Sequence, residues 1–198
     1  MTKKKGQKIG LYFGSFNPIH IGHLAIANYM LEFTNLDQIW FVVSPHNPLK
    51  KKRTLLADHH RLEMVNIAVE NQPNYKASNI EFKLTQPSYT INTLAYLQEK
   101  HPEYNFVLIM GSDSLETLPQ WKNYEQILSL FNIYVYPRPG FNSQFHLASH
   151  ESVKIVNAPL MEISSSFIRK AIKDGKNVQF FLPEKVYQYI NEMNFYKK

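Results

Sequence analysis

Short apolar runs alternate along this chain with segments in which apolar residues recur at helical spacing. Runs rich in β-branched and aromatic side chains, and short enough to be strands, occur at Ile9–Phe13, Ile39–Val43, Phe106–Met110 and Ile133–Tyr136. Such runs are typical of strands buried on both faces of a parallel sheet. The run Ile80–Leu84 instead alternates apolar and charged residues, which predicts a strand with one wetter face at the edge of the sheet.

Helical spacing is found between these runs. Apolar residues lie three or four positions apart in three sets, which are Leu24, Ala27 and Leu31, then Leu62, Val65 and Val69, then Ile91, Leu94 and Leu97. Near the C-terminus, serines precede a helical segment that stops at Gly175, and Pro183 is well placed to begin a last helix. Because strands and helices alternate, we expect an α/β fold, with a Rossmann-like, doubly wound, mainly parallel sheet and helices on both faces.

Length and composition limit the class of protein. The 198 residues suffice for one domain, 1–198, in which 1–8 form a basic tail and 164–198 contain the last helices. With 44% hydrophobic residues spread evenly, the chain is expected to be a soluble globular protein. The apolar run after the N-terminal lysines is too short for a signal peptide, so we expect a cytoplasmic protein. The absence of cysteine excludes disulfides, a thiolate nucleophile and a cysteine-ligated zinc.

The chain is basic, with a formal net charge of +6. This charge would suit nucleic acid or a small polyanion such as a nucleotide. Much of the excess lies in two short runs, Lys3–Lys5 and Lys50–Arg53. We expect the first to be a solvated tail, because blocks of like charge are usually disordered. The second follows a predicted strand and is the better candidate for contact with a phosphate.

Three unusual segments follow predicted strands, and a fourth begins a late helix. The first three are GSFNPIHIGH from Gly14, PHNPLKKK from Pro45 and GSDS from Gly111, and the fourth is SSSFIR from Ser164. In doubly wound sheets ligands bind beyond the carboxyl ends of the strands, where helix N-termini present unpaired amides. The sequence therefore predicts a ligand site built from these segments.

The segment from Gly14 to His23 contains groups that bind anions, although it is neither a P-loop nor a G-x-G-x-x-G dinucleotide motif. It offers backbone amides after Gly14, the Ser15 hydroxyl and two imidazoles. His20 and His23 are three residues apart near a helix start, so both can reach one phosphate, as neutral donors or as cations. Gly22 would let a nucleotide approach the backbone closely. Such groups stabilise the charge that builds on a phosphorus under attack.

Two other interpretations of the histidines are open. A zinc site would need a third and a fourth ligand, and the sequence has neither cysteine nor an H-E-x-x-H motif. The two rings could also pack at the helix start for structural reasons alone. The marked segments at other strand ends favour a phosphate site.

Four segments together resemble a known family. GSFNPIHIGHL resembles the G-x-F-x-P-x-H-x-G-H signature of the nucleotidyltransferase superfamily, and SSSFIR resembles its I-S-S-T-x-I-R motif. With PSYTINTL at 87–94 and GSDSLETLPQWKNYEQIL at 111–128, the chain is similar to the nicotinate-nucleotide adenylyltransferases over nearly its whole length. The first and last motifs specify the superfamily, and the middle two specify the branch.

The resemblance implies a reaction in which the 5′-phosphate of nicotinate mononucleotide attacks the α-phosphorus of ATP, giving deamido-NAD and pyrophosphate in NAD biosynthesis. It implies Mg²⁺ carried by the ATP phosphates, no other metal, and neither nucleic acid nor a membrane as partner. The helices within 164–198 would complete the ATP site. The matching positions make His20 and His23 catalytic, and they assign ATP binding to Gly14, Ser15, Phe16, Gly111, Asp113, Ser165, Ser166 and Arg169.

The acceptor side of the reaction also has matching positions. Ser88, Tyr89 and Thr90 match the segment that receives the nicotinate carboxylate, and Trp121 matches the tryptophan that stacks on the pyridine ring. The residues themselves agree, because Thr90 is placed to cap a helix at Ile91–Leu97, and a helix N-terminus favours an anion. We therefore expect the acid mononucleotide to be preferred to the amide.

The chain departs from the family pattern in two places. After the second strand the family commonly shows P-P-H-K, whereas this chain reads SPHNPLKKKR, which leaves Lys50 and Lys51 as possible phosphate contacts. In the late motif Ser166 stands where threonine is usual, and the hydroxyl is kept. The alternatives are an adenylyltransferase for nicotinamide mononucleotide or phosphopantetheine, or a non-catalytic nucleotide- or nucleic-acid-binding protein.

Overall fold

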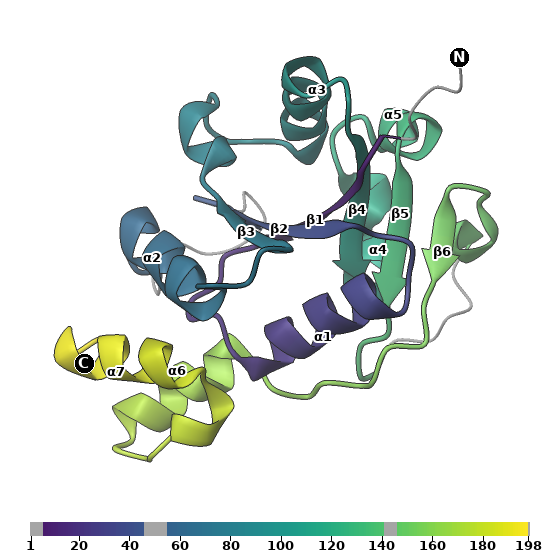
Figure 1. The fold of residues 1–198 in the computed structure, drawn as a ribbon. Helices are drawn as coiled ribbons and strands as arrows, with labels where there is room; N and C mark the ends of the chain where they lie inside the picture. The colour runs from purple at the N-terminus through teal and green to yellow at the C-terminus, as the bar shows by residue number, and fades with distance from the viewer. Residues whose placement is uncertain (1–5, 46–54, 141–145, 198) are drawn as a thin grey trace.

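A parallel sheet forms the centre of the protein (Figure 1). The computed structural model describes residues 6–45, 55–140 and 146–197. The sheet has six strands in the order β3-β2-β1-β4-β5-β6, and each neighbouring pair is parallel. The strands are β1 (Lys8–Gly14), β2 (Gln38–Val43), β3 (Tyr75–Ser78), β4 (Asn105–Gly111), β5 (Asn132–Tyr136) and β6 (Val153–Ile155). This is the strand order of a Rossmann-like fold, as the sequence predicts.

The four predicted central strands are confirmed, and their apolar runs explain why they lie at the centre. Ile9 and Leu11 of β1 are fully buried, and so are the apolar residues of β2 from Ile39 to Val43, apart from a small exposed fraction at Trp40. Leu11 lies opposite Trp40 on one neighbour and Leu108 on the other. A strand with apolar residues at successive positions presents apolar side chains on both faces of the sheet. Both faces must therefore be covered by helices to bury them.

The predicted edge strand at Ile80–Leu84 is wrong. Residues Ile80–Lys83 form a 3₁₀ helix, η2, and the edge strand is β3, just before it. The alternation of apolar and charged residues is misleading here because Glu81 is buried together with its neighbour Ile80. The opposite edge strand, β6, is only three residues long and has two exposed positions, so it leaves little pattern in the sequence.

Helices cover both faces of the sheet. They are α1 (Ile21–Glu32), α2 (Asp58–Ala68), α3 (Thr90–Lys100), α4 (Ser112–Thr117), α5 (Tyr124–Leu130), α6 (Ser165–Lys173) and α7 (Glu184–Glu192), with further 3₁₀ turns η3 (Leu118–Gln120), η4 (His146–Ser149) and η5 (Gln179–Phe181). The helices predicted from apolar spacing are all present. The Ser164 hydroxyl accepts from the Phe167 backbone N–H at the start of α6, Gly175 follows that helix with φ +68°, and Pro183 directly precedes α7.

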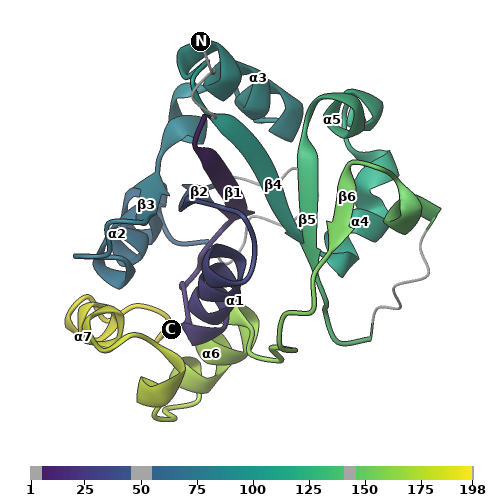
Figure 2. The ribbon, with the colours of Figure 1, turned by 45° about the vertical axis from the view of Figure 1, so that its right-hand side comes forward.

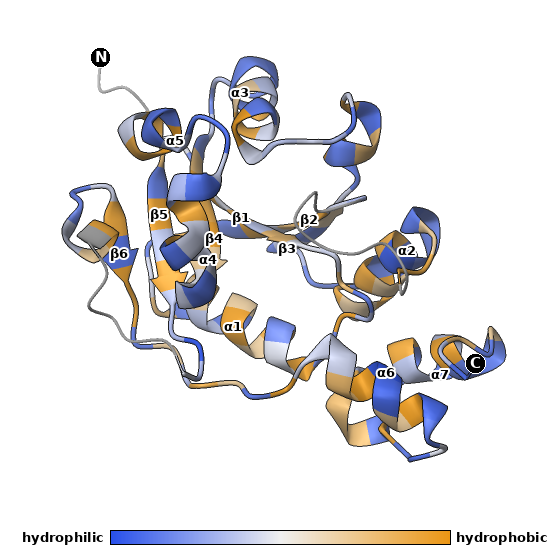
Figure 3. Ribbon diagram, turned by 180° about the vertical axis from the view of Figure 1, so that it is seen from behind, coloured by the Kyte–Doolittle hydropathy of each residue, from blue (hydrophilic) through white to orange (hydrophobic). Residues whose placement is uncertain are grey.

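Each face of the sheet has its own core. Side chains of α1, α2, α6 and α7 pack with one face, including the buried Ile26, Met64, Ile168 and Val186. Side chains of α3, α4 and α5 pack with the other face. Figure 2 shows α6 beside α1, although the two helices are far apart in the sequence. In Figure 3 both α6 and α7 carry hydrophobic and hydrophilic stretches in turn, as expected of helices with one packed side.

Candidate active site

A pocket of about 320 Å³ lies at the carboxyl ends of β1, β4 and β5. It spans the point where the strand order reverses, between β1 and β4, which is where doubly wound sheets bind ligands. The first and last sequence motifs both contribute to its walls. The predicted residues that line it are Gly14, Ser15, Phe16, His20, His23, Asp113, Ser165, Ser166 and Arg169.

The loop after β1 has a backbone shape that depends on Gly14. Phe16 adopts a left-handed conformation, with φ +44°, and its ring is buried against Tyr12 and Phe41. A Cβ atom on Gly14 would lie 2.8 Å from this ring, so only glycine fits there without a shift of the loop. Phe16 thus anchors the loop in the core, while Ser15 lies between these two residues and remains half-buried at the pocket.

His20 and His23 form a stacked pair at the start of α1. His20 is the N-cap residue and His23 is the third residue of the helix. Their ring centroids are 3.7 Å apart with an interplanar angle of 29°. The backbone N–H of His20 donates to Nδ1 of His23 at 3.2 Å. A neutral His23 therefore carries its proton on Nε2, the nitrogen that can donate to an anion.

The two histidines differ in their surroundings. His20 is 4% exposed, and burial, with a smaller contribution from the Arg138 charge, lowers its pKa from 6.5 to about 4. His20 is therefore neutral at neutral pH, which decides between the two protonation states left open by the sequence. Its Nδ1 atom is buried and has no hydrogen-bond partner among the described residues.

Gly22 makes room for the His20 imidazole, while close approach of a nucleotide at this position stays a prediction. A Cβ atom at this position would lie 3.0 Å from Nδ1 of His20 and 3.7 Å from the Cβ of Ile163. The small residue lets the His20 ring fold back over the first turn of α1. Substituting Gly22 would displace that ring from its stacked position.

The late motif is joined to the opening motif by hydrogen bonds. The Ser165 hydroxyl donates to the Pro18 carbonyl at 2.9 Å, and Nη1 of Arg169 donates to the Asn17 carbonyl at 2.8 Å. Nη2 of Arg169 lies 3.3 Å from the Ser166 hydroxyl. The positive N-terminal end of α6 and one guanidinium therefore face the pocket from the side opposite β4.

The end of β4 contributes Asp113, and the loop after β5 contributes a cation that sequence reasoning missed. Arg138 lines the pocket, and its Nε lies 3.8 Å from Oδ1 of Asp113. Gly111 is not a lining residue, but a Cβ atom there would collide with the Asp113 carboxylate and with the Arg138 side chain. The available signal was positional, because Arg138 lies two residues past the predicted strand Ile133–Tyr136.

Two tyrosines that the sequence did not single out also line the pocket. The Tyr12 hydroxyl donates to the Tyr136 hydroxyl at 3.1 Å across the ends of β1 and β5. Burial raises the pKa of both phenols, and each also feels the nearby Asp113 charge. Both are therefore neutral hydrogen-bonding groups. Asn17, inside the opening motif, is a further lining residue that the predicted site residues do not include.

The predicted acceptor residues lie outside this pocket, at the start of α3 and after η3. Ser88 is buried, and Tyr89 is the N-cap residue of α3. The predicted cap at Thr90 is wrong, because Thr90 is the first residue of the helix and no side chain caps this end. Lys122 brings the two acceptor segments together, since its Nζ lies 4.6 Å from the centre of the Tyr89 ring and it directly follows Trp121.

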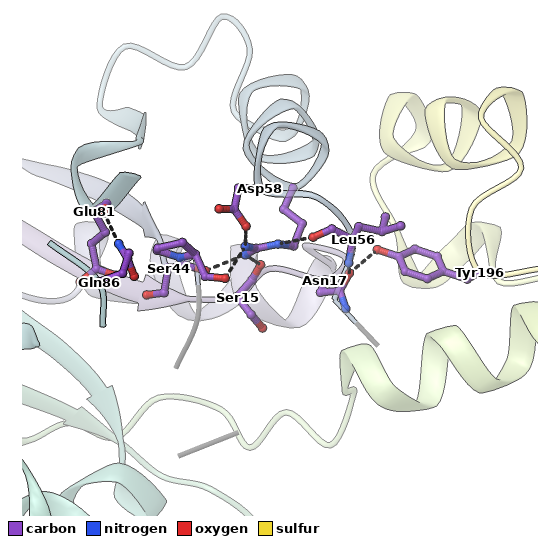
Figure 4. Close-up of polar contacts among 10 residues, drawn as sticks. Ser15, Asn17, Ser44, Leu56, Asp58, Glu81, Gln86 and Tyr196 are labelled. Carbon is purple, nitrogen blue, oxygen red and sulfur yellow. Dashed lines mark hydrogen bonds and ion pairs between the residues drawn. The ribbon is translucent and has the colours of Figure 1, made fainter. Parts of the chain in front are cut away.

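A buried carboxyl supports the Ser88 segment. Glu81 is 3% exposed and accepts from the Thr93 hydroxyl at 2.8 Å. Burial raises its pKa, while hydrogen bonds from Ser44, Thr93 and Ser88 act in the opposite direction. Gln86 donates to the Glu81 carbonyl at 2.9 Å (Figure 4). Ser44 follows β2, Thr93 lies in α3 and Ser88 belongs to the predicted acceptor segment. Glu81 therefore links these three parts of the chain.

Lys50 and Lys51 lie outside the described residues, but both flanks of their segment are held by a buried arginine. Arg61 of α2 has no exposed surface. Its five N–H groups all donate, from Nε to the Leu56 carbonyl at 3.1 Å, from Nη1 to the carbonyls of Ser15 at 2.6 Å and Ser44 at 2.8 Å, and from Nη2 to the Pro45 carbonyl at 3.2 Å and the Asp58 carboxylate at 2.6 Å (Figure 4). Arg61 therefore ties the phosphate loop to the end of β2 and to the start of α2.

The described residues form no cluster of three or more histidine, cysteine, aspartate or glutamate side chains that could hold a metal ion. Asp113 is the acidic side chain that lines the pocket, and it already faces Arg138. A Mg²⁺ ion is commonly bound through one or two carboxylates plus substrate phosphates and water. The pocket fits an ion that arrives with a polyphosphate.

Known proteins with similar sequences cover the whole of this architecture. The cytidylyltransferase-like family matches residues 11–171. A protein of Flavobacterium psychrophilum named "Probable nicotinate-nucleotide adenylyltransferase" is 60% identical over 96% of this chain and 100% of its own length. A protein of the same name from Bacteroides thetaiotaomicron is 45% identical over 97% of this chain and 95% of its own length.

Solved structures with the same fold were also found. The nicotinic acid mononucleotide adenylyltransferase of Plasmodium falciparum, complexed with NaAD, superposes with a TM-score of 0.80 and covers 96% of this chain, 98% of its own. The same enzyme complexed with APC gives a TM-score of 0.79. The sequence identity is 22% in both cases, so this likeness establishes the fold.

Proposed function

The chain belongs to the cytidylyltransferase-like family, and we propose that it transfers the adenylyl group of ATP to nicotinate mononucleotide, giving deamido-NAD and pyrophosphate for NAD biosynthesis. The observation that carries this proposal is the meeting of the two end motifs. Ser165 and Arg169 bond to Pro18 and Asn17 beside the stacked histidines, in one pocket at the reversal of strand order. The curated relatives with the same name support the choice of acceptor.

The proposed reaction exchanges one phosphoanhydride bond for another. An oxygen of the acceptor's 5′-phosphate forms a bond to the α-phosphorus of ATP, and the bond from that phosphorus to the α,β-bridging oxygen breaks. The electron pair leaves with pyrophosphate, so the step needs no redox partner and no covalent enzyme intermediate. Catalysis then depends on holding the reacting groups in line and on stabilising charge on the phosphate oxygens.

The pocket supplies donors and cations for this purpose. We propose that His23 donates from Nε2 to a phosphate oxygen, since its Nδ1 is occupied by the His20 backbone N–H. Arg169 and the N-terminus of α6 would hold the β- and γ-phosphates, and Arg138 adds a second guanidinium to the lining of the pocket. His20 is neutral and would act by placing the His23 ring and by donating a hydrogen bond.

Mg²⁺ would enter bound to the ATP phosphates. When bound, the ion neutralises part of the triphosphate charge and assists the departure of pyrophosphate. Asp113 is the acidic residue of the pocket that could contact the ion directly or through water. The remaining coordination would come from phosphate oxygens and water.

The acceptor ring would lie between the start of α3 and Trp121. The first turn of α3 holds no acidic residue, and its free amides give a partly positive end that attracts a carboxylate. Lys122, which lies over the Tyr89 ring, adds positive charge near the same point. Trp121 is half-buried against the core, and its remaining exposed surface would stack on the pyridine ring.

The described residues contain no helix that is both long and apolar enough to cross a membrane. We propose a cytoplasmic location, where ATP and mononucleotides are available.

Acceptor choice is testable with purified protein. Pyrophosphate release should be measured with Mg-ATP and, in parallel, nicotinate mononucleotide, nicotinamide mononucleotide and phosphopantetheine. The acid mononucleotide should give the highest kcat/KM, by about tenfold or more over the amide, because a charge-assisted contact contributes about 1.5–3 kcal/mol. Equal values for the acid and the amide would remove the proposed role of the α3 N-terminus, and turnover of phosphopantetheine alone would replace the proposed acceptor.

A further inference from the structure

Asn17 lies where four parts of the chain come together at the ATP pocket. These are its own loop, the segment at Leu56, Arg169 of α6 and Tyr196. Asn17 lines the pocket and is 1% exposed. Its side-chain Oδ1 accepts from the Tyr196 hydroxyl at 2.8 Å and from the Leu56 backbone N–H at 3.3 Å (Figure 4). Its backbone carbonyl accepts from Arg169 at 2.8 Å. The position of Asn17 therefore decides where the Arg169 guanidinium lies.

Leu56 gives Asn17 a rigid reference point. The Leu56 carbonyl accepts from Nε of Arg61, whose Nη1 also holds the Ser15 carbonyl. Ser15 and Asn17, on either side of Phe16, are thus both connected to the buried Arg61 guanidinium, Ser15 directly and Asn17 through Leu56. The remaining freedom of the Asn17 side chain is limited by Tyr196, whose hydroxyl donates to the same oxygen (Figure 4).

Tyr196 is held in place by a short segment with an unusual backbone. Asn194 and Tyr196 have φ of +54° and +65°, in the left-handed region that non-glycine residues seldom adopt. Such conformations are unfavourable for non-glycine residues and persist where surrounding contacts over-determine them. Phe195 supplies such contacts, with its ring centroid 4.7 Å from His60 and 5.8 Å from Tyr189. The strain accompanies a side chain that is directed at the pocket.

The Tyr196 hydroxyl is a neutral donor in these surroundings. Burial raises the pKa of the phenol well above its ordinary value, although the charges of Arg169 and Arg61 act in the opposite direction. Both of these guanidiniums are therefore near the hydroxyl, as the hydrogen-bond chain requires. A neutral phenol can satisfy a buried amide oxygen without adding charge beside a polyphosphate site.

We propose that Tyr196 is a positioning residue of the ATP site, whose hydroxyl fixes Asn17 and, through the Asn17 carbonyl, the Arg169 guanidinium. The inference rests on the proposed function, because it assigns the affected pocket to ATP. It extends the site to a segment beyond the last helix that carries no sequence motif. Tyr196 does not touch the reacting atoms, and it acts through Asn17 and Arg169.

The test is Tyr196→Phe, which removes only the hydroxyl, with Tyr134→Phe as the matched control. Tyr134 also donates to an asparagine side-chain oxygen, that of Asn35 at 2.5 Å, and does not line the pocket. Both variants should stay folded and lose a similar, small part of their unfolding free energy, because each loses one buried hydrogen bond. Tyr196→Phe should weaken binding of a non-hydrolysable ATP analogue by about 3- to 10-fold and lower kcat/KM for ATP to match, with KM for the mononucleotide unchanged.

Several outcomes would overturn this role. Analogue binding by Tyr196→Phe at the wild-type level would do so, and so would equal weakening in the two variants, which would indicate a general loss of stability. A rise in the mononucleotide KM as large as the loss for ATP would contradict the assignment to the ATP side. The binding assay also separates this inference from the proposed function. If Tyr196→Phe weakens analogue binding while the wild type forms no dinucleotide, the positioning role stands and the acceptor assignment fails.

Discussion

The two histidines of the opening motif differ in their surroundings and in their proposed roles, although they stand as a pair in the sequence. His20 is buried and neutral, and its backbone N–H orients the His23 ring. The sequence predicted both residues from their spacing and from the family motif that they match, and the spacing placed them correctly on one side of the helix start. It could not give their protonation, because the His20 pKa is lowered by burial in the folded chain and, to a smaller extent, by the charge of the distant Arg138.

Burial of His20 makes stability depend on pH. The unfolded chain takes up a proton on this residue as the pH falls below 6.5, whereas the folded chain does so only near pH 4. Unfolding free energy should therefore be highest above pH 6.5 and decline between pH 6.5 and 4. At pH 5 the contribution of His20 should be a loss of about 2 kcal/mol, because each pKa unit corresponds to about 1.4 kcal/mol.

Urea unfolding of the wild type and of His20→Asn at pH 7 and pH 5 measures this effect. The variant lacks the titrating group, so its stability should change less between the two pH values, by about 2 kcal/mol. Parallel pH dependence in the two proteins would show that His20 is not held neutral by the fold.

At the scale of helices and strands, long apolar patterns predicted the elements correctly. A short pattern that mixed apolar and charged residues did not. The central strands and the five helices with predicted spacing or caps are present where expected. The segment Ile80–Leu84 was misread because a buried charge looks like a surface position when its partners are unknown. The hydroxyls that satisfy Glu81 come from Ser44, Ser88 and Thr93, on three other segments. The N-cap of α3 is Tyr89, one residue before the predicted Thr90, so no side-chain acceptor caps this end, but the positive helix end remains.

The junction of α2 with the phosphate loop should depend strongly on Arg61. Arg61→Met removes five hydrogen bonds and leaves buried backbone carbonyls without donors, which should cost about 3–5 kcal/mol of unfolding free energy. Asp58→Asn removes the charged partner only, and its side chain is 44% exposed. This second variant should cost less than about 1 kcal/mol.

Denaturant unfolding of these two variants distinguishes the alternatives. A large loss confined to Arg61→Met would show that the carbonyl contacts hold the junction. Equal losses in Arg61→Met and Asp58→Asn would show that the ion pair matters and the carbonyl contacts do not.

At the scale of the whole molecule, topology assembles the site. Its parts follow β1, β4 and β5 or begin α6, and the strand order brings these ends to one edge of the sheet. The motif residues could be predicted because each motif is local. Arg138, Arg61 and Tyr196 could not, because each acquires its role from a partner on a distant segment, respectively Asp113, Ser15 and Asn17. Such pairings are invisible to spacing and composition.

Labelled ATP tests the central claim most directly. With nicotinate mononucleotide and Mg²⁺, label from [α-³²P]ATP should appear in the dinucleotide deamido-NAD, and label from [γ-³²P]ATP should appear only in pyrophosphate. His23→Ala should slow the appearance of both labelled products by ~10²–10³-fold while keeping the fold, as expected for the loss of one transition-state donor. Transfer of the γ-label to the mononucleotide, or release of the γ-label as inorganic phosphate with no dinucleotide formed, would contradict adenylyl transfer.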